Sequence, residues 1–413
     1  MAKQYNNFKL KNDILKNNRI LYVLPYSLFP VNSGNKNLTY NLLQQTVSEF
    51  ECDIICLVDD NEDFNLVEKN IRNTFINISN VYVYSYIRNI INFTNIIRFV
   101  HPAFCKYFNN ELVNFFKQIN LTCYYDLIHF DMIHTSIYKR YCMNIKSILV
   151  ASDAYSLSAK ISFQHEKKLI KKIKLIPQYF IFRYFENIIY KKFEAVCFVS
   201  EKDRLFAQNN SINNFKLIKI GVDDAYLVDY KQKYNNNSFK GLLISGAIDH
   251  SANADHFIEF LMQVVIHNSK IPITIIGKNI HYKLHNFIVK YSNIVYIPYV
   301  ENYVNFLNQD WIYIYPQKTG TGLQTKLQQA LAVGLPVITM NISINAFNLP
   351  SDNEILFTCD DYFSMTSIIE ILSNDIDLRM KYSKASSDFI KSTYSPNQIK
   401  ENIFSIYEMI LKI

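Results

Sequence analysis

Short apolar runs alternate with amphipathic stretches along most of the chain. The first run, RILYVLP (19–25), is followed by the loop FPVNSGNKN and by LTYNLLQQTVSEF, whose apolar residues have helical spacing. A second apolar run, CDIICLVDD (52–60), comes next. Strand, loop, helix and strand in this order predict a parallel α/β sheet. Further strands are predicted at VYVYSY (81–86), YDLIHFD (125–131), KSILVASD (146–153) and AVCFVS (195–200).

The same alternation restarts after a polar, Asn-rich stretch without periodicity at 227–240, which we interpret as a linker. The predicted strands beyond it are 241–246, 273–277, 293–300, 311–316 and 336–340, and the predicted helices lie near 254–266, 281–291 and 324–333. The tail from Tyr362 is predicted to be helical with a break at Pro396. The pattern predicts two Rossmann-like, doubly wound parallel-sheet domains, 1–226 and 241–396, which face a cleft. The helix at about 397–413 is expected to pack back on the first domain, and ligands should bind at the carboxyl ends of the strands.

Glycine is rare, with 8 residues in 413, and most of the glycines fall at bends between predicted elements. Gly34, Gly246 and Gly277 follow strands, and Gly320 and Gly322 separate the strand 311–316 from a helix. A glycine-containing loop that opens a helix offers free N–H groups and the positive end of the helix dipole, which suit a diphosphate.

The segment YPQKTGTGLQTKLQQALAVGLPVIT resembles the donor-binding motif of retaining glycosyltransferases of the B-type (GT-B) fold, the family-four group. Four further parts of the chain resemble that family in order and spacing. They are FPVNSGNKN, YDLIHFD with ILVASDAYSLS, AVCFVSEKDRLFAQ with LIKIGVDDAYL, and LLISGAIDHSANADHFIEF. The resemblance covers most of residues 19–400. It implies a nucleotide-sugar as co-substrate, no other cofactor and no metal.

The resemblance also implies a set of donor-binding residues. They are Gly34, Gly246, Gly277, Lys278, Thr319, Gly320, Thr321, Gly322, Leu323, Gln324, Lys326 and Gln329. Two glutamates of the family, which contact the transferred sugar and the donor ribose, fall at Thr321 and Gln329. Gln329 can hydrogen-bond to ribose, but its neutral amide lacks the charge-assisted strength of a carboxylate.

Three residues are candidates for catalysis: Asp153, Lys326 and His129. In the front-face mechanism proposed for this family the leaving diphosphate helps to deprotonate the acceptor, so that catalysis consists of positioning and charge stabilisation. Lys326 is either a diphosphate contact or a solvated helix lysine. Asp153 either lines the cleft or caps the following helix. His129, like Asp131 and His134 beside it, is either catalytic or a satisfied core residue.

Charge and cysteine content add little to this prediction. The formal net charge of +7 is interpreted as a mild excess spread over a large surface, which disfavours a nucleic-acid partner. The seven cysteines are expected to be free thiols in a reducing compartment. No run resembles a signal peptide or a spanning helix, so a cytoplasmic protein is expected.

The segment 165–193 is rich in lysine and in apolar residues. It is either a helix that rests on an anionic membrane, which would make the protein peripheral at the inner face, or an ordinary amphipathic helix that covers the core.

Together these features predict a glycosyltransferase. It would move a sugar from a nucleotide-sugar to a glycan, lipid-linked or protein acceptor in bacterial surface-glycan assembly, with retention. The alternative is an inactive partner or scaffold of an active transferase, since Thr321 and Gln329 replace the family's carboxylates.

Overall fold

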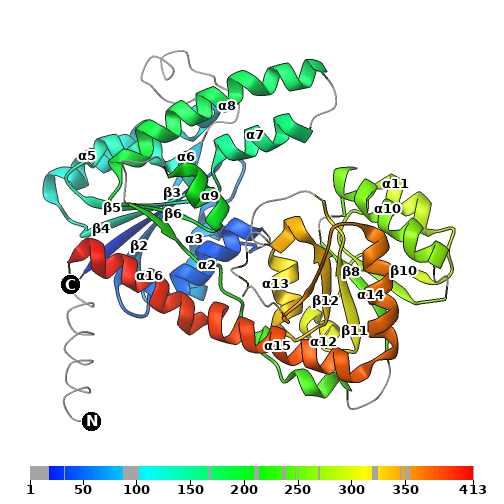
Figure 1. Ribbon diagram of the computed structural model, residues 1–413. Helices are drawn as coiled ribbons and strands as arrows, with labels where there is room; N and C mark the ends of the chain where they lie inside the picture. Colours follow the sequence, from blue (N-terminus) through cyan, green and yellow to red (C-terminus); the bar gives the residue numbers. More distant parts are fainter. Residues whose placement is uncertain are drawn as a thin grey trace, which may run out of the picture. The chain divides into compact units, whose positions relative to one another are not determined.

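The computed structural model describes residues 18–412 apart from 32, 87–101, 166–168, 209–213, 235–238, 247, 250, 268–269, 319–323, 345–346, 348 and 350–353. The chain forms two compact units (Figure 1). Unit 1 comprises 1–220 with 399–413, and unit 2 comprises 221–398. Each unit is built on one parallel sheet, which confirms the predicted architecture of two Rossmann-like doubly wound domains.

The sheet of unit 1 has seven strands in the order β3-β2-β1-β4-β5-β6-β7. All of the strand pairings are parallel. The strands are β1 (Arg19–Leu24), β2 (Glu51–Asp59), β3 (Ile78–Tyr86), β4 (Leu127–Asp131), β5 (Lys146–Ser152), β6 (Ala195–Phe198) and β7 (Phe215–Leu217). The order reverses between β1 and β4, which is the switch point where doubly wound sheets bind ligands.

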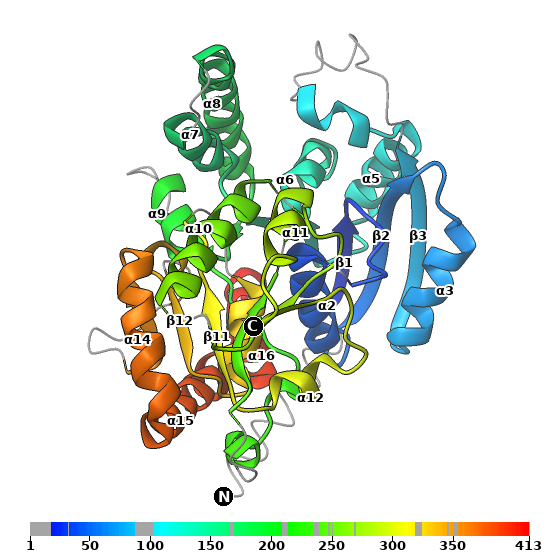
Figure 2. The ribbon, with the colours of Figure 1, turned by 90° about the vertical axis from the view of Figure 1, so that its right-hand side faces the viewer.

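Helices cover both faces of this sheet, because its central strands are apolar on both sides. Figure 2 shows α2 and α3 beside β1, β2 and β3. The helices of unit 1 are α2 (Gly34–Thr46), α3 (Phe64–Thr74), α5 (Asn110–Thr122), α6 (Met132–Thr135), α7 (Tyr155–His165), α8 (Leu169–Ile189), α9 (Glu201–Ala207) and α16 (Pro396–Leu411), with the 3-10 turns η1 (Pro102–Tyr107), η2 (Ser136–Tyr141) and η3 (Tyr190–Lys192).

The last helix, α16, completes the core of unit 1 (Figure 1). The Tyr407 hydroxyl lies 2.7 Å from His129 Nδ1 and 2.8 Å from the Tyr22 hydroxyl, and the Tyr22 hydroxyl lies 2.8 Å from Thr46 Oγ1 of α2. His129 is buried and stacks on Tyr22 with ring centroids 4.3 Å apart. Desolvation lowers the pKa of His129 to about 3, so the imidazole is neutral. His129 therefore joins the sheet to α16.

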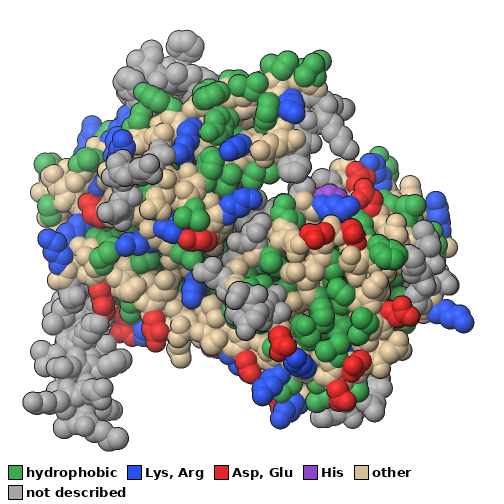
Figure 3. Space-filling view, viewed as in Figure 1, with side chains coloured by type: hydrophobic (Ala, Val, Ile, Leu, Met, Phe, Trp, Pro, Cys, Tyr) green, Lys and Arg blue, Asp and Glu red, His purple; other side chains and the backbone are tan. Residues whose placement is uncertain are grey.

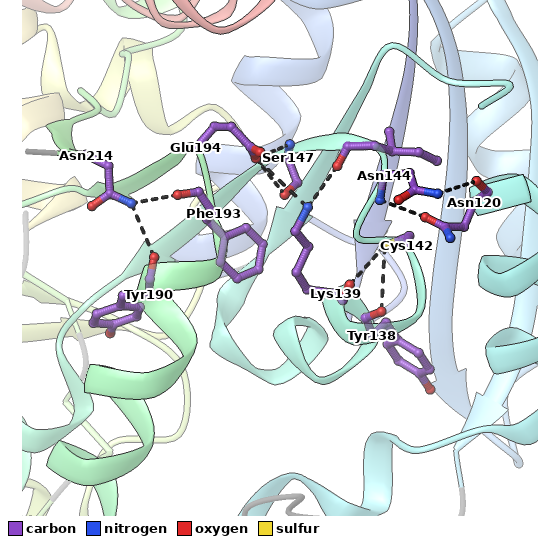
Figure 4. A network of polar contacts seen from close by, with 11 residues as sticks. Asn120, Tyr138, Lys139, Cys142, Asn144, Ser147, Tyr190, Phe193, Glu194 and Asn214 are labelled. Carbon is purple, nitrogen blue, oxygen red and sulfur yellow. Dashed lines mark hydrogen bonds and ion pairs between the residues drawn. The ribbon is translucent and has the colours of Figure 1, made fainter. Parts of the chain in front are cut away.

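A buried lysine joins the amino ends of β5 and β6 (Figure 4). Lys139 Nζ donates to the Ile145 carbonyl at 2.8 Å and lies 4.0 Å from a carboxylate oxygen of Glu194. That carboxylate accepts from the backbone N–H of Ser147 at 2.7 Å. Desolvation lowers the pKa of Lys139. Because ligands bind at the opposite edge of such sheets, we interpret this network as structural.

The sheet of unit 2 has six parallel strands in the order β10-β9-β8-β11-β12-β13. The strands are β8 (Gly241–Ser245), β9 (Ile273–Ile276), β10 (Ile294–Ile297), β11 (Trp311–Tyr315), β12 (Val337–Met340) and β13 (Phe357–Cys359). The helices are α10 (Ser251–His267), α11 (Tyr282–Ile288), α12 (Tyr303–Leu307), α13 (Thr325–Ala332), α14 (Tyr362–Asn374) and α15 (Ile376–Tyr394), with η4 (Asp224–Tyr226), η5 (Tyr230–Tyr234) and η6 (Asn341–Ile344).

Alternate residues of β8 point into two separate cores. Leu242 and Ile244 pack with α10, α11 and α14, whereas Leu243 packs with α12, α13 and α15. This alternation follows from the two-residue period of a strand. It places α13 on one face of the sheet, with its first residues near the carboxyl ends of β8 and β11.

The structure divides the chain at Ile220/Gly221, whereas the sequence pattern placed a linker at 227–240. Part of that stretch is packed on unit 2. Lys233 of η5 is buried, and its Nζ donates to the Val333 carbonyl at 2.5 Å and to the Gly334 carbonyl at 3.0 Å. The stretch was interpreted as a linker because lysine and tyrosine give it a polar composition. The apolar parts of these side chains nevertheless pack on unit 2.

Candidate functional site

The carboxyl edge of the sheet in unit 2 contains most of the predicted donor-binding residues that the structure describes. Gly246 follows β8 with φ +143°, and a Cβ placed there would meet no atom within 4 Å. The backbone at Gly246 is therefore open to a close approach by a ligand, and an L side chain is disfavoured by its φ. Gly277 follows β9 and is enclosed, because a Cβ there would come within 2.7 Å of Ile248 Cγ1.

Lys326 lies on the first turn of α13, above a cluster of hydroxyl groups. Its Nζ is 3.9 Å from the centroid of the Tyr303 ring. The Tyr303 hydroxyl lies 2.6 Å from Ser245 Oγ, which is 2.9 Å from the Tyr313 hydroxyl. Ser245 is the last residue of β8 and Tyr313 is in β11, so the two central strands and α12 together fix the ring beneath the ammonium group.

Desolvation lowers the pKa of Lys326 to about 8. Within the described part of unit 2, no acidic side chain forms an ion pair with Lys326 that would offset this effect. A half-buried cation that lies on an aromatic face gains from a bound anion, because the anion restores the lost solvation. The position at the start of a helix adds the positive end of the helix dipole.

The side chain of Gln324, the residue before α13, lies within hydrogen-bonding distance of β11 and does not cap the helix. The Tyr315 hydroxyl of β11 lies 2.8 Å from Gln317 Oε1 and also within hydrogen-bonding distance of Gln324 Oε1, and its single proton is donated to one of these two oxygens. Gln324 occupies the N-cap position of α13, but its side chain forms no capping hydrogen bond. The first N–H groups of the helix are therefore not satisfied by this side chain.

Gln329, where the sequence resemblance leads to the expectation of a glutamate, lies one turn further along α13 from Lys326. The Gln329 side chain hydrogen-bonds to the Tyr226 hydroxyl. Burial raises the pKa of Tyr226 to about 12, and this hydrogen bond opposes the rise. The Gln329 Oε1 atom is buried and has no hydrogen-bond partner in the described structure. A buried amide oxygen without a donor is costly, so this atom is suited to accept from a hydroxyl group of a ligand.

The other predicted donor residues are distributed less compactly. Thr319, Gly320, Thr321, Gly322 and Leu323 lie outside the described residues. Lys278 is exposed after β9. Gly34 belongs to unit 1, where it is the first residue of α2 after the N-cap Ser33.

The polar carboxyl edge of unit 1 contains the buried carboxylate of Asp131 and the partly buried carboxylate of Asp153. Asp131, at the end of β4, accepts from Tyr26 and, at 2.7 Å, from Thr39 Oγ1, and burial raises its pKa to about 6. Asp153 follows β5, and burial together with the neighbouring Asp203 raises its pKa to about 6. His129 is on the same strand as Asp131, but its ring contacts α16 within the core.

A cavity of about 510 Å³ in unit 2 lies between α10 and the start of α14. Its lining includes Glu259, Asp361 and Lys318, and Lys318 Nζ is paired with Glu259 at 2.9 Å. Two carboxylates and one neutralised lysine are a poor environment for a diphosphate. We therefore place the candidate site at Lys326.

Sequence reasoning missed Tyr303, Ser245 and Tyr226, which surround Lys326 and Gln329. Each lies outside the glycine-rich motif. Ser245 could have been found from its position at the carboxyl end of a predicted strand. No signal in the sequence separates Tyr303 or Tyr226 from the other 28 tyrosines of the total of 30.

The two units have the fold of GT-B glycosyltransferases, and this fold is shared by solved structures over nearly the whole chain. Residues 240–375, which include α13, match the model of the family described as Glycosyl transferases group 1. No curated protein sequence matches the chain at a significant level.

Three of the similar solved structures are the following. HepE from Anabaena, solved in complex with UDP, is 10% identical with a TM-score of 0.64, and the match covers 95% of this chain and 100% of HepE. Sucrose-phosphate synthase from Thermosynechococcus elongatus is 11% identical with a TM-score of 0.66, over 95% of this chain and 99% of the synthase. TarM is 12% identical with a TM-score of 0.66, over 96% of this chain and 99% of TarM.

Proposed function

We propose that the chain is a glycosyltransferase that uses a nucleotide-sugar donor bound at the carboxyl edge of unit 2. The acceptor is a glycan, a lipid-linked sugar or a protein, and the role is in bacterial surface-glycan assembly. The match of 240–375 to the glycosyltransferase family model supports the reaction class. The UDP bound to HepE supports the donor class. Transfer with retention and without a metal is part of the proposal and is based on the resemblance of the motif around Lys326.

The observation that carries the proposal is the desolvated ammonium group of Lys326 at the start of α13, which pairs with no acidic side chain among the residues described. A diphosphate would supply the missing negative charge, and the helix N-terminus would add N–H donors. The buried Oε1 of Gln329 would accept a hydroxyl of the ribose. During transfer the same lysine would stabilise the charge that develops on the leaving diphosphate.

Ligand-induced stabilisation tests this proposal. The full chain is titrated with UDP-, GDP- and CMP-sugars, and the unfolding temperature is followed. A donor that binds only the folded state at 100 times its Kd should add about 2.7 kcal/mol to the free energy of unfolding. Absence of a shift with every donor would contradict the proposal.

A variant comparison shows whether any such shift arises at Lys326. Lys326→Ala should weaken donor binding by roughly 10- to 100-fold, because a hydrogen bond to a charged group is lost. The matched control is Lys381→Ala in the same unit, where the lysine is exposed and pairs with Glu354 at 2.7 Å. Equal donor affinity in the two variants would contradict the assignment of the site.

The alternative of an inactive partner is favoured by one observation, the neutral Gln329 where the family has a carboxylate. It predicts donor binding without turnover. Release of the free nucleotide from the bound donor, measured with and without candidate acceptors, separates the two: turnover that is lost in Lys326→Ala supports the enzyme.

A further inference from the structure

The helix α8 is apolar on two sides, although only one side is packed against unit 1. On the inner side Phe182 and Glu186 are buried. Phe182 lies against Tyr155 of α7 with ring centroids 5.4 Å apart, and the Glu186 carboxylate accepts from the backbone N–H of Ser156 at 3.1 Å. These contacts fix which side of α8 faces the protein.

The outer side of α8 carries a row of large apolar side chains. Their spacing of three or four residues places them on one face of the helix. Their exposed fractions lie between 42% and 72%. We call this row the outer stripe; it consists of Leu169, Ile173, Ile176, Phe180, Tyr184 and Ile188. Figure 3 shows hydrophobic side chains along this part of unit 1 with lysine and arginine side chains among them.

The outer stripe is unusually long for an exposed apolar row on a surface helix. The helix has 21 residues, and at 1.5 Å per residue it extends for about 30 Å. A typical surface helix places charged and polar residues on its solvent side. A continuous exposed apolar face of this kind marks an interaction surface.

The charge of the chain is concentrated around the same helix. Residues 155–193 contain nine Lys and Arg residues against two acidic residues, Glu166 and Glu186, an excess of seven. The whole chain has a formal net charge of +7, so the rest of the sequence is balanced. The expectation of a diffuse charge is therefore wrong: the formal excess lies in the sequence stretch 155–193.

We propose that the outer stripe of α8 binds an anionic lipid surface, with the helix lying in the interface. The apolar side chains would enter the boundary between headgroups and acyl chains, while basic residues of the stretch 155–193 would contact anionic headgroups. A second copy of the chain fits less well, because two such faces would bring two basic segments together. Among the helices that the structure describes, none is long and apolar enough to cross a membrane.

Vesicle co-sedimentation of the full chain tests this proposal. Vesicles of phosphatidylcholine alone are compared with vesicles that contain about 40% phosphatidylglycerol. We expect binding to the anionic vesicles that is at least about tenfold tighter than to the neutral ones. Raising the salt to about 0.5 M should reduce this difference, because headgroup attraction is screened.

The double variant Ile173→Ser/Phe180→Ser removes two members of the outer stripe without changing charge. It should bind anionic vesicles at least about tenfold more weakly, since two apolar side chains no longer enter the interface. The matched control is Leu121→Ser on α5 of the same unit, where the leucine is 84% exposed. Unchanged unfolding temperatures would show that both variants fold.

Three results would overturn the proposal. They are no binding to anionic vesicles, equal binding of the double variant and the wild type, and a dimer in light scattering that only the double variant loses. The last would identify a second copy of the chain as the occupant. Donor-induced stabilisation of the double variant should equal that of the wild type, so that failure here is distinguishable from failure of the donor site.

Discussion

Lys326 combines a positive charge with surroundings that disfavour it. The aromatic ring of Tyr303 lies 3.9 Å below its ammonium group, and desolvation lowers its pKa to about 8. Near pH 8 the lysine therefore changes its charge in a range where an ordinary lysine remains protonated. This property follows from the packing of three separate elements around one side chain.

Donor binding should depend on pH because only the protonated lysine attracts a diphosphate. The affinity should be highest below pH 8 and should fall by up to about tenfold per pH unit above it, since the proton must then be taken up on binding. In Lys326→Arg the guanidinium stays charged, and the fall above pH 8 should disappear. Calorimetric titration of the donor between pH 6.5 and 9.5 measures both curves. Parallel curves for wild type and variant would refute the prediction.

Gln329 offers a second prediction at the level of a single residue. Its Oε1 is buried without a partner, and Gln329→Glu would place a carboxylate oxygen there. A ribose hydroxyl donates more strongly to a carboxylate, so the donor should bind roughly tenfold more tightly. The unfolding temperature without donor should fall, because a buried charge is costly. Gln329→Met supplies the comparison without an acceptor oxygen, and it should bind the donor more weakly than the wild type.

A buried ion pair in unit 2 has a structural role. Arg379 of α15 pairs with Asp310, with Nη2 to Oδ2 at 2.9 Å and Nε to Oδ1 at 3.0 Å. Asp310→Ala would leave the guanidinium buried without its carboxylate and should cost about 3–5 kcal/mol of the free energy of unfolding. Urea unfolding of the variant measures this loss. A loss below about 1 kcal/mol would show that the pair is solvated.

At the scale of elements, the ends of α13 depend on backbone conformations as much as on side chains. Gly334 follows the helix with φ +72°, and a Cβ there would lie 2.7 Å from Tyr230 Cβ and 2.8 Å from the Ser383 carbonyl oxygen. The glycine thus permits α15 and η5 to approach the end of α13.

Gly334→Ala should destabilise the protein by more than about 1 kcal/mol, because the left-handed conformation and the contact are both unfavourable. Gly246→Ala is the comparison, since its Cβ meets no atom within 4 Å and only the positive φ is penalised. Thermal unfolding should rank Gly334→Ala as the less stable variant. If Gly246→Ala were instead the less stable variant, the segment η5 would have to move away from the new Cβ at little cost.

The burial of His129 against α16 should make the stability of the protein depend on pH. Burial lowers the pKa of His129 to about 3 from 6.5, so the native state binds fewer protons than the unfolded state between these values. Stability should therefore fall as the pH falls below 6.5, by up to about 1.4 kcal/mol per pH unit. Asp131 has the opposite sign, since its raised pKa of about 6 favours the native state as the pH falls from 6 to 3.8.

The contribution of His129 can be isolated with His129→Gln, which removes the titrating group and keeps a hydrogen-bonding side chain. Its free energy of unfolding should vary less between pH 6.5 and 4 than that of the wild type. An identical slope would show that His129 does not carry the dependence.

Strands with a clear apolar run could be predicted from the sequence, whereas two three-residue strands could not. The buried strands β1, β2, β5, β8 and β11 begin and end within two residues of their apolar runs, because burial on both faces demands apolar sequence. The strands β7 (Phe215–Leu217) and β13 (Phe357–Cys359) have only three residues each and are partly exposed, so their pairing depends on the sheet beside them.

At the scale of the whole molecule, the presence of two parallel-sheet domains followed from the alternation of strands and helices, whereas the strand order of each sheet was not predicted. The candidate site could be predicted from the sequence only in part. The motif on α13 indicated Lys326 and Gln329, whereas Tyr303 and Ser245 reach Lys326 through the fold. Charge was interpreted wrongly because the total of +7 does not reveal that residues 155–193 carry the whole excess.

The division of the chain between the units also sets an order of events during synthesis. Unit 1 needs Tyr407 to cover Tyr22 and His129, yet all of 221–398 is translated before that residue. Domains commonly fold as they leave the ribosome, with the N-terminal one first. Here unit 2 is the first to be complete, and unit 1 has an open core until the final helix is released. A released chain truncated after Gln398 should therefore present a protease-resistant unit 2 and a protease-sensitive unit 1.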